Sequence, residues 1–129
     1  MARKEQYDIK NVFRLNLKPH PFSFIKDKKK DVEMRLYDPK RRAIQIGDLI
    51  IFTNQETGEE LVAEVLELRR FKDFNALYEF YPKTRIGYEK DDVAHPDDML
   101  QYYSKGAIER YGAYAIVIRL VDDKNATEI

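Results

Sequence analysis

Three ionisable residues, Lys30, Glu33 and Arg35, lie close together in a short segment of alternating character. Side chains of a β-strand point alternately to its two faces, so the apolar residues of 32–36 would face a core while Glu33 and Arg35 share the other face. Their head groups can then orient each other, with Lys30 at the start of the strand. We expect Lys30 and Arg35 to contact a phosphate or a base edge and Glu33 to accept from a base amino group. An ordinary surface ion pair of little energetic weight is the alternative.

The formal net charge of zero conceals an asymmetry along the chain. Residues 1–45 hold 13 Lys or Arg against 6 Asp or Glu, whereas the remainder holds 10 against 17. Arg41 and Arg42 add two cations just after the expected strand. A basic segment in an otherwise acidic chain indicates either a solvated charged face or a surface for nucleic acid.

Tyrosine is the second chemical signal, with 9 in a chain of 129 residues. Aromatic faces beside a basic groove suit single-stranded bases or nucleosides. Tyr103 and Tyr111 are the candidates for base contact, although a tyrosine of this kind can equally be a core residue with a solvated hydroxyl. The tyrosines near polar sequence are Tyr37, Tyr88, Tyr102, Tyr103 and Tyr111.

Other chemistries find little support in the sequence. The absence of cysteine removes disulfides and thiolate sites and fits a reducing cytoplasm, so we expect a cytoplasmic protein. His20 and His95 are far apart, so no metal is expected. The glycines form no phosphate-binding loop, and no cofactor is expected. Ser104 is better explained as a helix cap than as a nucleophile. No apolar run is long enough to predict a membrane helix.

The order of expected elements indicates one α+β domain over 11–121, with a flexible arm at 1–10 and a polar tail at 122–129. We expect a small, curled, barrel-like sheet with short helices packed around it. The polar segment 83–94 is a connection that could lie over a cleft. Strands are expected at 13–17, 31–37, 49–52 (covered on both faces), 61–68 and 113–120, and helices after Lys18-Pro19-His20, Asp73, His95 and Ser104.

Several of these motifs together resemble the ASCH domain family, in particular its bacterial stand-alone members. The resemblance spans about Phe13 to Leu120 and is carried by Pro21-Phe22, Lys28-Lys29-Lys30, Glu33-x-Arg35, Arg41-Arg42, Gly47-Asp48 and Ile50-Ile51-Phe52. It implies a PUA-like β-barrel fold and binding of RNA or a nucleotide derivative in a cleft beside the barrel.

The resemblance also implies an alternative, because bacterial ASCH proteins include a small amidohydrolase that acts on acetylcytidine. Glu33 stands where that enzyme has its threonine nucleophile, so a hydrolase would use Lys30 as base and Glu33 to activate water. A protein-interaction adaptor is a third option, given the acidic second half. We predict RNA or nucleotide binding, with Lys30, Arg35, Arg41 and Arg42 on phosphates and Glu33 with Tyr103 or Tyr111 on the base.

Overall fold

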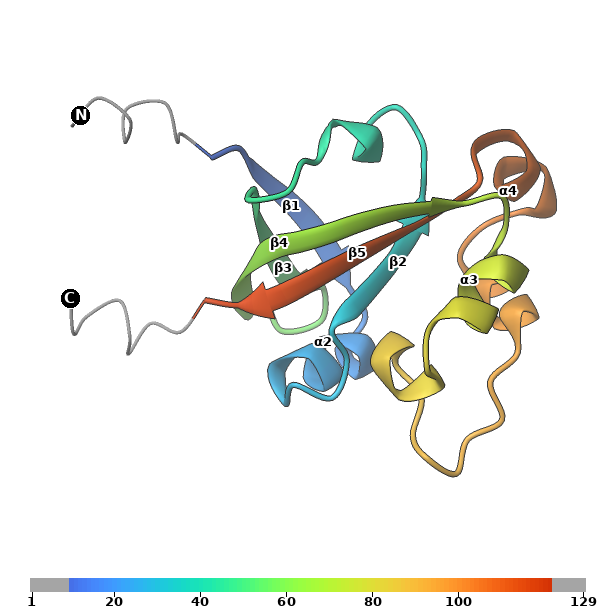
Figure 1. Ribbon diagram of the computed structural model, residues 1–129. Helices are drawn as coiled ribbons and strands as arrows, with labels where there is room; N and C mark the ends of the chain where they lie inside the picture. The colour runs from blue at the N-terminus through green and yellow to red at the C-terminus, as the bar shows by residue number, and fades with distance from the viewer. Residues whose placement is uncertain (1–9, 122–129) are drawn as a thin grey trace.

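The computed structural model describes residues 10–121, which form a five-stranded sheet with short helices around it (Figure 1). Nearly all of the predicted arm and all of the predicted tail therefore lie outside the described residues. The strands are β1 (Val12–Leu17), β2 (Val32–Leu36), β3 (Leu49–Asn54), β4 (Glu60–Phe71) and β5 (Ala113–Leu120).

The strand order across the sheet is β1-β3-β4-β5-β2. β1 pairs with β3 in parallel, and the other neighbours are antiparallel. β1 and β2 are thus the two edges, and Arg35 Nη2 on β2 donates to the Asn16 carbonyl on β1 at 2.9 Å. The sheet therefore curls into a half-barrel whose edges are joined by a side chain. The predicted α+β class and barrel-like sheet are confirmed.

Short helices connect the strands, and side chains cap two of them as predicted. Asp73 accepts from the Ala76 amide at 3.0 Å, and Ser104 accepts from the Ala107 amide at 3.1 Å. The helix expected at Pro21 instead begins at Pro19, because either proline is tolerated in a first turn. The helices are α2 (Pro19–Lys26), α3 (Phe74–Phe80) and α4 (Lys105–Tyr111), with 3₁₀ turns η1 (Arg41–Ala43), η2 (Lys83–Ile86) and η3 (Pro96–Gln101).

The sheet is packed on both faces. One core contains Phe22 and Ile25 of α2 against strand residues such as Phe52. The other contains Phe74 and Leu77 of α3, together with residues of η2, η3 and β2. Because helices cover one face and α2 closes the other, β2 lies between two packed layers.

This packing corrects two expectations. Glu33 and Arg35 were expected on an open face of their strand, yet all five residues of β2 are buried. In β3, only alternate residues such as Ile50 and Phe52 are fully buried, so the apolar run is not covered on both faces. Like β2, β5 is covered on both faces, because its residues 113–118 are all buried. Within the described part of the chain, no helix is long and apolar enough to span a membrane.

Candidate functional site

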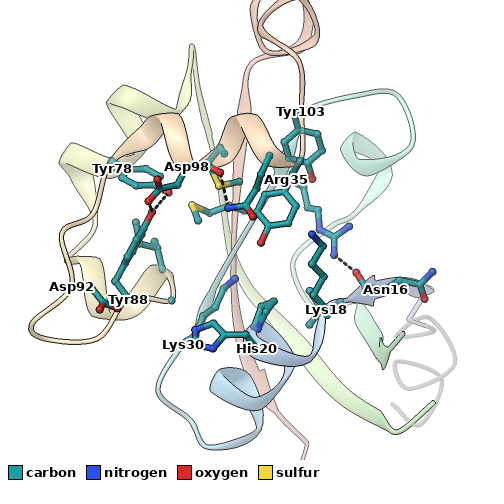
Figure 2. A pocket seen from close by; sticks show the side chains of 18 of the residues that line it. Asn16, Lys18, His20, Lys30, Arg35, Tyr78, Tyr88, Asp92, Asp98 and Tyr103 are labelled. Carbon is teal, nitrogen blue, oxygen red and sulfur yellow. Dashed lines mark hydrogen bonds between the residues drawn. The ribbon is translucent and has the colours of Figure 1, made fainter. Parts of the chain in front are cut away.

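A cavity of about 450 Å³ lies where the free edges of β1 and β2 face the segments that follow β4. Figure 2 shows its side chains approaching from two sides, with Asn16, Lys18 and Arg35 opposite Tyr78, Tyr88 and Asp98. The lining residues are Asn16, Leu17, Lys18, His20, Pro21, Lys30, Met34, Arg35, Gln55, Tyr78, Ile86, Gly87, Tyr88, Asp92, Val93, Asp98, Met99, Gln101, Tyr102 and Tyr103.

A buried ion cluster of Lys30, Glu33 and Arg35 lies against one wall of this cavity. Lys30 Nζ lies 2.9 Å from Glu33 Oε1, and Arg35 Nε donates to Glu33 Oε2 at 2.7 Å. The three side chains are 8%, 4% and 11% exposed, respectively. Oε1 has no further hydrogen-bond partner among residues 10–121, so Lys30 is its only counter-group. One carboxylate therefore holds two cations in fixed positions, and the cluster keeps a net positive charge.

The electrostatics of the cluster favour the ionised forms of Glu33 and Arg35. Burial alone would raise the pKa of Glu33, but Lys30 and Arg35 outweigh it, so the pKa of Glu33 lies below its usual value. Burial likewise opposes the charge of Arg35, yet Glu33 and then Tyr103 raise the pKa of Arg35 above its usual value. The guanidinium is thus a permanent cation at the cavity wall.

The opposite wall carries a chain of hydroxyl groups that ends on a carboxylate. The Tyr78 and Tyr88 hydroxyls are 2.8 Å apart, and Tyr88 donates to Asp98 Oδ2 at 2.6 Å. Burial raises the pKa of both Tyr78 and Tyr88, and for Tyr88 the bond to Asp98 raises it further. Both phenols are therefore neutral near pH 7 and can donate or accept hydrogen bonds towards a ligand.

The rim of the cavity combines a cation with an aromatic face. Lys18 is exposed, and its Nζ lies 5.1 Å from the centre of the Tyr102 ring. Tyr102 is 45% exposed, whereas its neighbour Tyr103 is partly buried and stacks on Phe74 with ring centres 6.0 Å apart. Tyr102 thus exposes part of its side chain beside the Lys18 ammonium, whereas one face of the Tyr103 ring is occupied by Phe74.

The segment after η2 forms a third wall. Gly87, Tyr88, Asp92 and Val93 all line the cavity, so the connection predicted at 83–94 does border a cleft. Gly87 has φ +111°, and a Cβ placed there would lie 3.3 Å from Lys30 Cδ. Glycine at this position therefore allows the segment to approach the buried lysine closely.

The structure brings some of the predicted site residues together and separates others. Lys30, Arg35 and Tyr103 line the cavity, and Glu33 lies behind the two cations without lining it. Arg41 and Arg42 lie on η1 and do not line the cavity. Tyr111 instead packs against the core that contains Phe74 and Leu77 of α3. Glu33 is thus placed to orient Lys30 and Arg35 rather than to touch a ligand in the cavity.

Sequence reasoning missed Asn16, Lys18, Tyr78 and Asp98. Tyr78 packs against the core that contains Phe74 and Leu77, and Asp98 lies in the first turn of η3, so neither position by itself indicates a polar role in a site. Only the fold brings η3 opposite the end of β1. Lys18 carried a usable signal, because it directly follows the strand expected at 13–17 and precedes a proline, which favours extended backbone at that position. The described part of the chain has no group of three or more His, Cys, Asp or Glu residues placed to hold a metal ion.

The curled five-stranded sheet with its edge cavity defines the class of protein as a small α+β fold of the PUA-like type. A family model described as the ASCH domain matches residues 15–122, and the chain belongs to the ASCH domain family. No protein of curated function matches this chain.

Solved structures agree with the family assignment. The crystal structure of hypothetical protein PH0355 superposes with a TM-score of 0.73 at 30% identity, covering 85% of this chain and 99% of that one. The solution structure of protein PF0455 from Pyrococcus furiosus superposes with a TM-score of 0.63 at 28% identity, covering 86% of this chain and 98% of that one. The crystal structure of ASCH from Zymomonas mobilis superposes with a TM-score of 0.61 at 16% identity, covering 92% of this chain and 78% of that one. At this identity the similarity supports the fold alone.

Proposed function

We propose that the chain binds RNA or a nucleotide derivative in the cavity between the edges of β1 and β2. The observation that carries the proposal is the composition of this cavity, which joins basic side chains to tyrosine side chains. Its volume of about 450 Å³ is within the range of small-ligand sites. Phosphate binding needs fixed positive charge, and single-stranded bases need aromatic faces, so the two features suit one ligand.

In this binding mode the phosphate lies between Lys18 and Arg35. Lys18 is exposed and can move to its ligand, whereas Arg35 is held by Glu33 and by the Asn16 carbonyl. A guanidinium already in position loses little side-chain entropy on binding. The base then lies towards Tyr102, whose ring is partly exposed beside Lys18.

The wall of Tyr78, Tyr88 and Asp98 supplies polar contacts for the base or sugar. Sequence reasoning gave Glu33 the role of accepting from a base amino group, but Glu33 is enclosed by Lys30 and Arg35. Asp98 is exposed at the cavity and is better placed for that role. The same enclosure gives no support to the hydrolase alternative, since a water activated by Glu33 would have to displace one of the two cations.

Fluorescence anisotropy with labelled single-stranded RNA tests this proposal. We expect affinity to fall steeply between roughly 50 and 200 mM salt, because phosphate contacts release counterions. Lys18→Ala should weaken binding and reduce the slope of log affinity against log salt by about 0.7. Lys26→Ala is the matched control, because Lys26 is an exposed lysine of α2 that does not line the cavity. Equal effects of the two substitutions, or affinity that does not change with salt, would contradict the proposal.

A further inference from the structure

We propose that Tyr37, Arg42 and Arg70 form a second phosphate subsite next to the cavity. The ligand is then a single strand with at least two phosphates, rather than a free mononucleotide. This inference depends on the proposed nucleotide binding in the cavity and names the class of ligand for it.

Two guanidiniums lie over one aromatic ring at this place. Arg70 Cζ is 4.6 Å and Arg42 Cζ is 5.1 Å from the centre of the Tyr37 ring. The two cations are thus at most about 10 Å apart, within a Debye length at moderate ionic strength. Contact with the ring orients each planar guanidinium and leaves its N–H groups available.

Neither cation is neutralised within the described residues. In the part of the chain that the structure describes, the Arg42 side chain donates only to the Tyr37 carbonyl, at 3.4 Å. The nearby carboxylate of Asp38 is occupied by Arg41, which binds it through Nη1 and through its backbone amide, both at 2.9 Å. The arginines that form ion pairs in residues 10–121 are Arg14, Arg35, Arg41, Arg85 and Arg119. Arg42 and Arg70 are both exposed and have no carboxylate partner among residues 10–121, so an anion at the surface would be attracted to both.

The strand register connects this subsite to the cavity. Tyr114 on β5 pairs with Arg35 on one side and with Arg70 on the other. Directly paired residues of antiparallel strands share a face, so Arg35, Tyr114 and Arg70 form one row across three strands. The Tyr37 ring packs edge-on against Tyr114 with centres 4.8 Å apart, which places the subsite beside this row.

The spacing of the row fits a strand of nucleic acid. Two strand spacings separate the backbones at Arg35 and Arg70 by about 10 Å. Stacked nucleotides advance by about 3.4 Å each, so about three nucleotides span the distance from the cavity to the subsite. A mononucleotide bound at Arg35 would not reach Arg70.

The chain itself offers a matched control in Arg69. It precedes Arg70 on β4, is also exposed, and also lies over an aromatic ring, with Cζ 4.4 Å from the centre of Phe80. Because successive residues of a strand point to opposite faces, Arg69 projects from the other side of the sheet. Arg69→Gln therefore removes the same charge from the same strand without touching the row.

The experiment measures affinity for oligouridylates of one to about six nucleotides by competition against labelled RNA. For the unmodified chain, we expect affinity to rise by about threefold to tenfold once the strand is about three nucleotides long, as for one exposed charge-assisted contact. Arg70→Gln and, from a different element, Arg42→Gln should each remove this rise while leaving uridine monophosphate binding unchanged. The Arg69→Gln variant should keep the rise in affinity with strand length. Circular dichroism of each variant checks that the fold is retained.

The outcomes separate the subsite from the proposed function. If all lengths bind equally well, or if Arg69→Gln and Arg70→Gln act alike, the second subsite is wrong while binding in the cavity stands. If Arg70→Gln lowers the affinity for uridine monophosphate as much as the affinity for the longer strands, the subsite is not separate from the cavity and the inference is overturned. If neither uridine monophosphate nor any strand binds, the proposed function fails and the inference with it. Equal effects of Arg70→Gln on polyglutamate and RNA would indicate a general polyanion surface and also overturn the inference.

Discussion

Replacing Glu33 by Gln should destabilise the fold strongly, although it removes only one charge. The substitution leaves Lys30 and Arg35 with no counter-charge in a site where their side chains are 8% and 11% exposed. At a separation of about 4 Å and an effective dielectric constant of about 20, each lost attraction is about 4 kcal/mol before compensation. Water entry from the adjoining cavity compensates part of this loss. The measured cost of breaking a buried pair, about 3–5 kcal/mol, is therefore the expected loss.

Urea denaturation followed by circular dichroism measures this loss as a change in the free energy of unfolding. Glu60→Gln is the control, because it breaks an ion pair of similar length, 3.1 Å to Arg14, whose side chains are 49% and 65% exposed. We expect it to cost less than about 1 kcal/mol. If both variants lose the same small amount of free energy of unfolding, the cluster is solvated and the reasoning from burial is refuted.

A triple variant separates stability from binding. Apolar residues of similar size can replace a buried ion cluster without loss of stability, since all the desolvation costs are removed together. Lys30→Met combined with Glu33→Leu and Arg35→Met should therefore unfold at a higher urea concentration than Glu33→Gln alone. It should nevertheless lose RNA affinity. Retained affinity would show that the cluster is structural and that the cavity binds its ligand by other groups.

Two further predictions concern pH and backbone geometry. The pKa of Glu33 is lower in the folded chain than in the unfolded one, so its stabilising contribution is complete above the unfolded value of about 4.3 and is lost as the pH falls through the folded value. The stability difference between the unmodified chain and Glu33→Gln should thus narrow in urea titrations below about pH 4, and a constant difference would contradict the assigned pKa direction. Gly112→Ala should cost about 1–3 kcal/mol, because Gly112 has φ +81° and a Cβ there would lie 2.8 Å from the Phe71 carbonyl. Gly106→Ala, in α4 with open space around it, should be neutral or stabilising, and thermal melts of the two variants followed by circular dichroism measure the difference.

Rules that use only neighbouring residues in the sequence were sufficient to predict the strands and helices and one side-chain contact of the site. The period of two placed Glu33 and Arg35 on the same face of a strand, and their head groups do meet. Asp73 and Ser104 were recognised as caps because a cap depends only on residues three positions away. The observed end of an element differs from the predicted one where two residues are equally suited to it, as at Pro19 and Pro21, either of which can start α2.

Burial and the second wall of the cavity could not be derived from local rules. Periodicity states which side chains share a face, but not which distant segment covers that face. The polar face of β2 is enclosed because the sheet curls and brings β1 opposite it, so that Arg35 contacts Asn16, 19 residues away in sequence. Asp98 faces Tyr88 across a turn whose course depends on the packing of α3 and η3. Both facts are properties of the tertiary structure.

The incomplete closure of the sheet explains why charge and cavity occur together. In a closed barrel, the edges of β1 and β2 would pair through backbone hydrogen bonds and leave no space between them. Here the Arg35 guanidinium reaches the Asn16 carbonyl instead, and a side chain of that length holds the edges apart. A buried guanidinium requires a carboxylate, which Glu33 supplies, and Glu33 also holds Lys30 in place. The gap that makes the cavity thus also requires the cations that line it, so a substitution that closed the gap would remove the anion site as well.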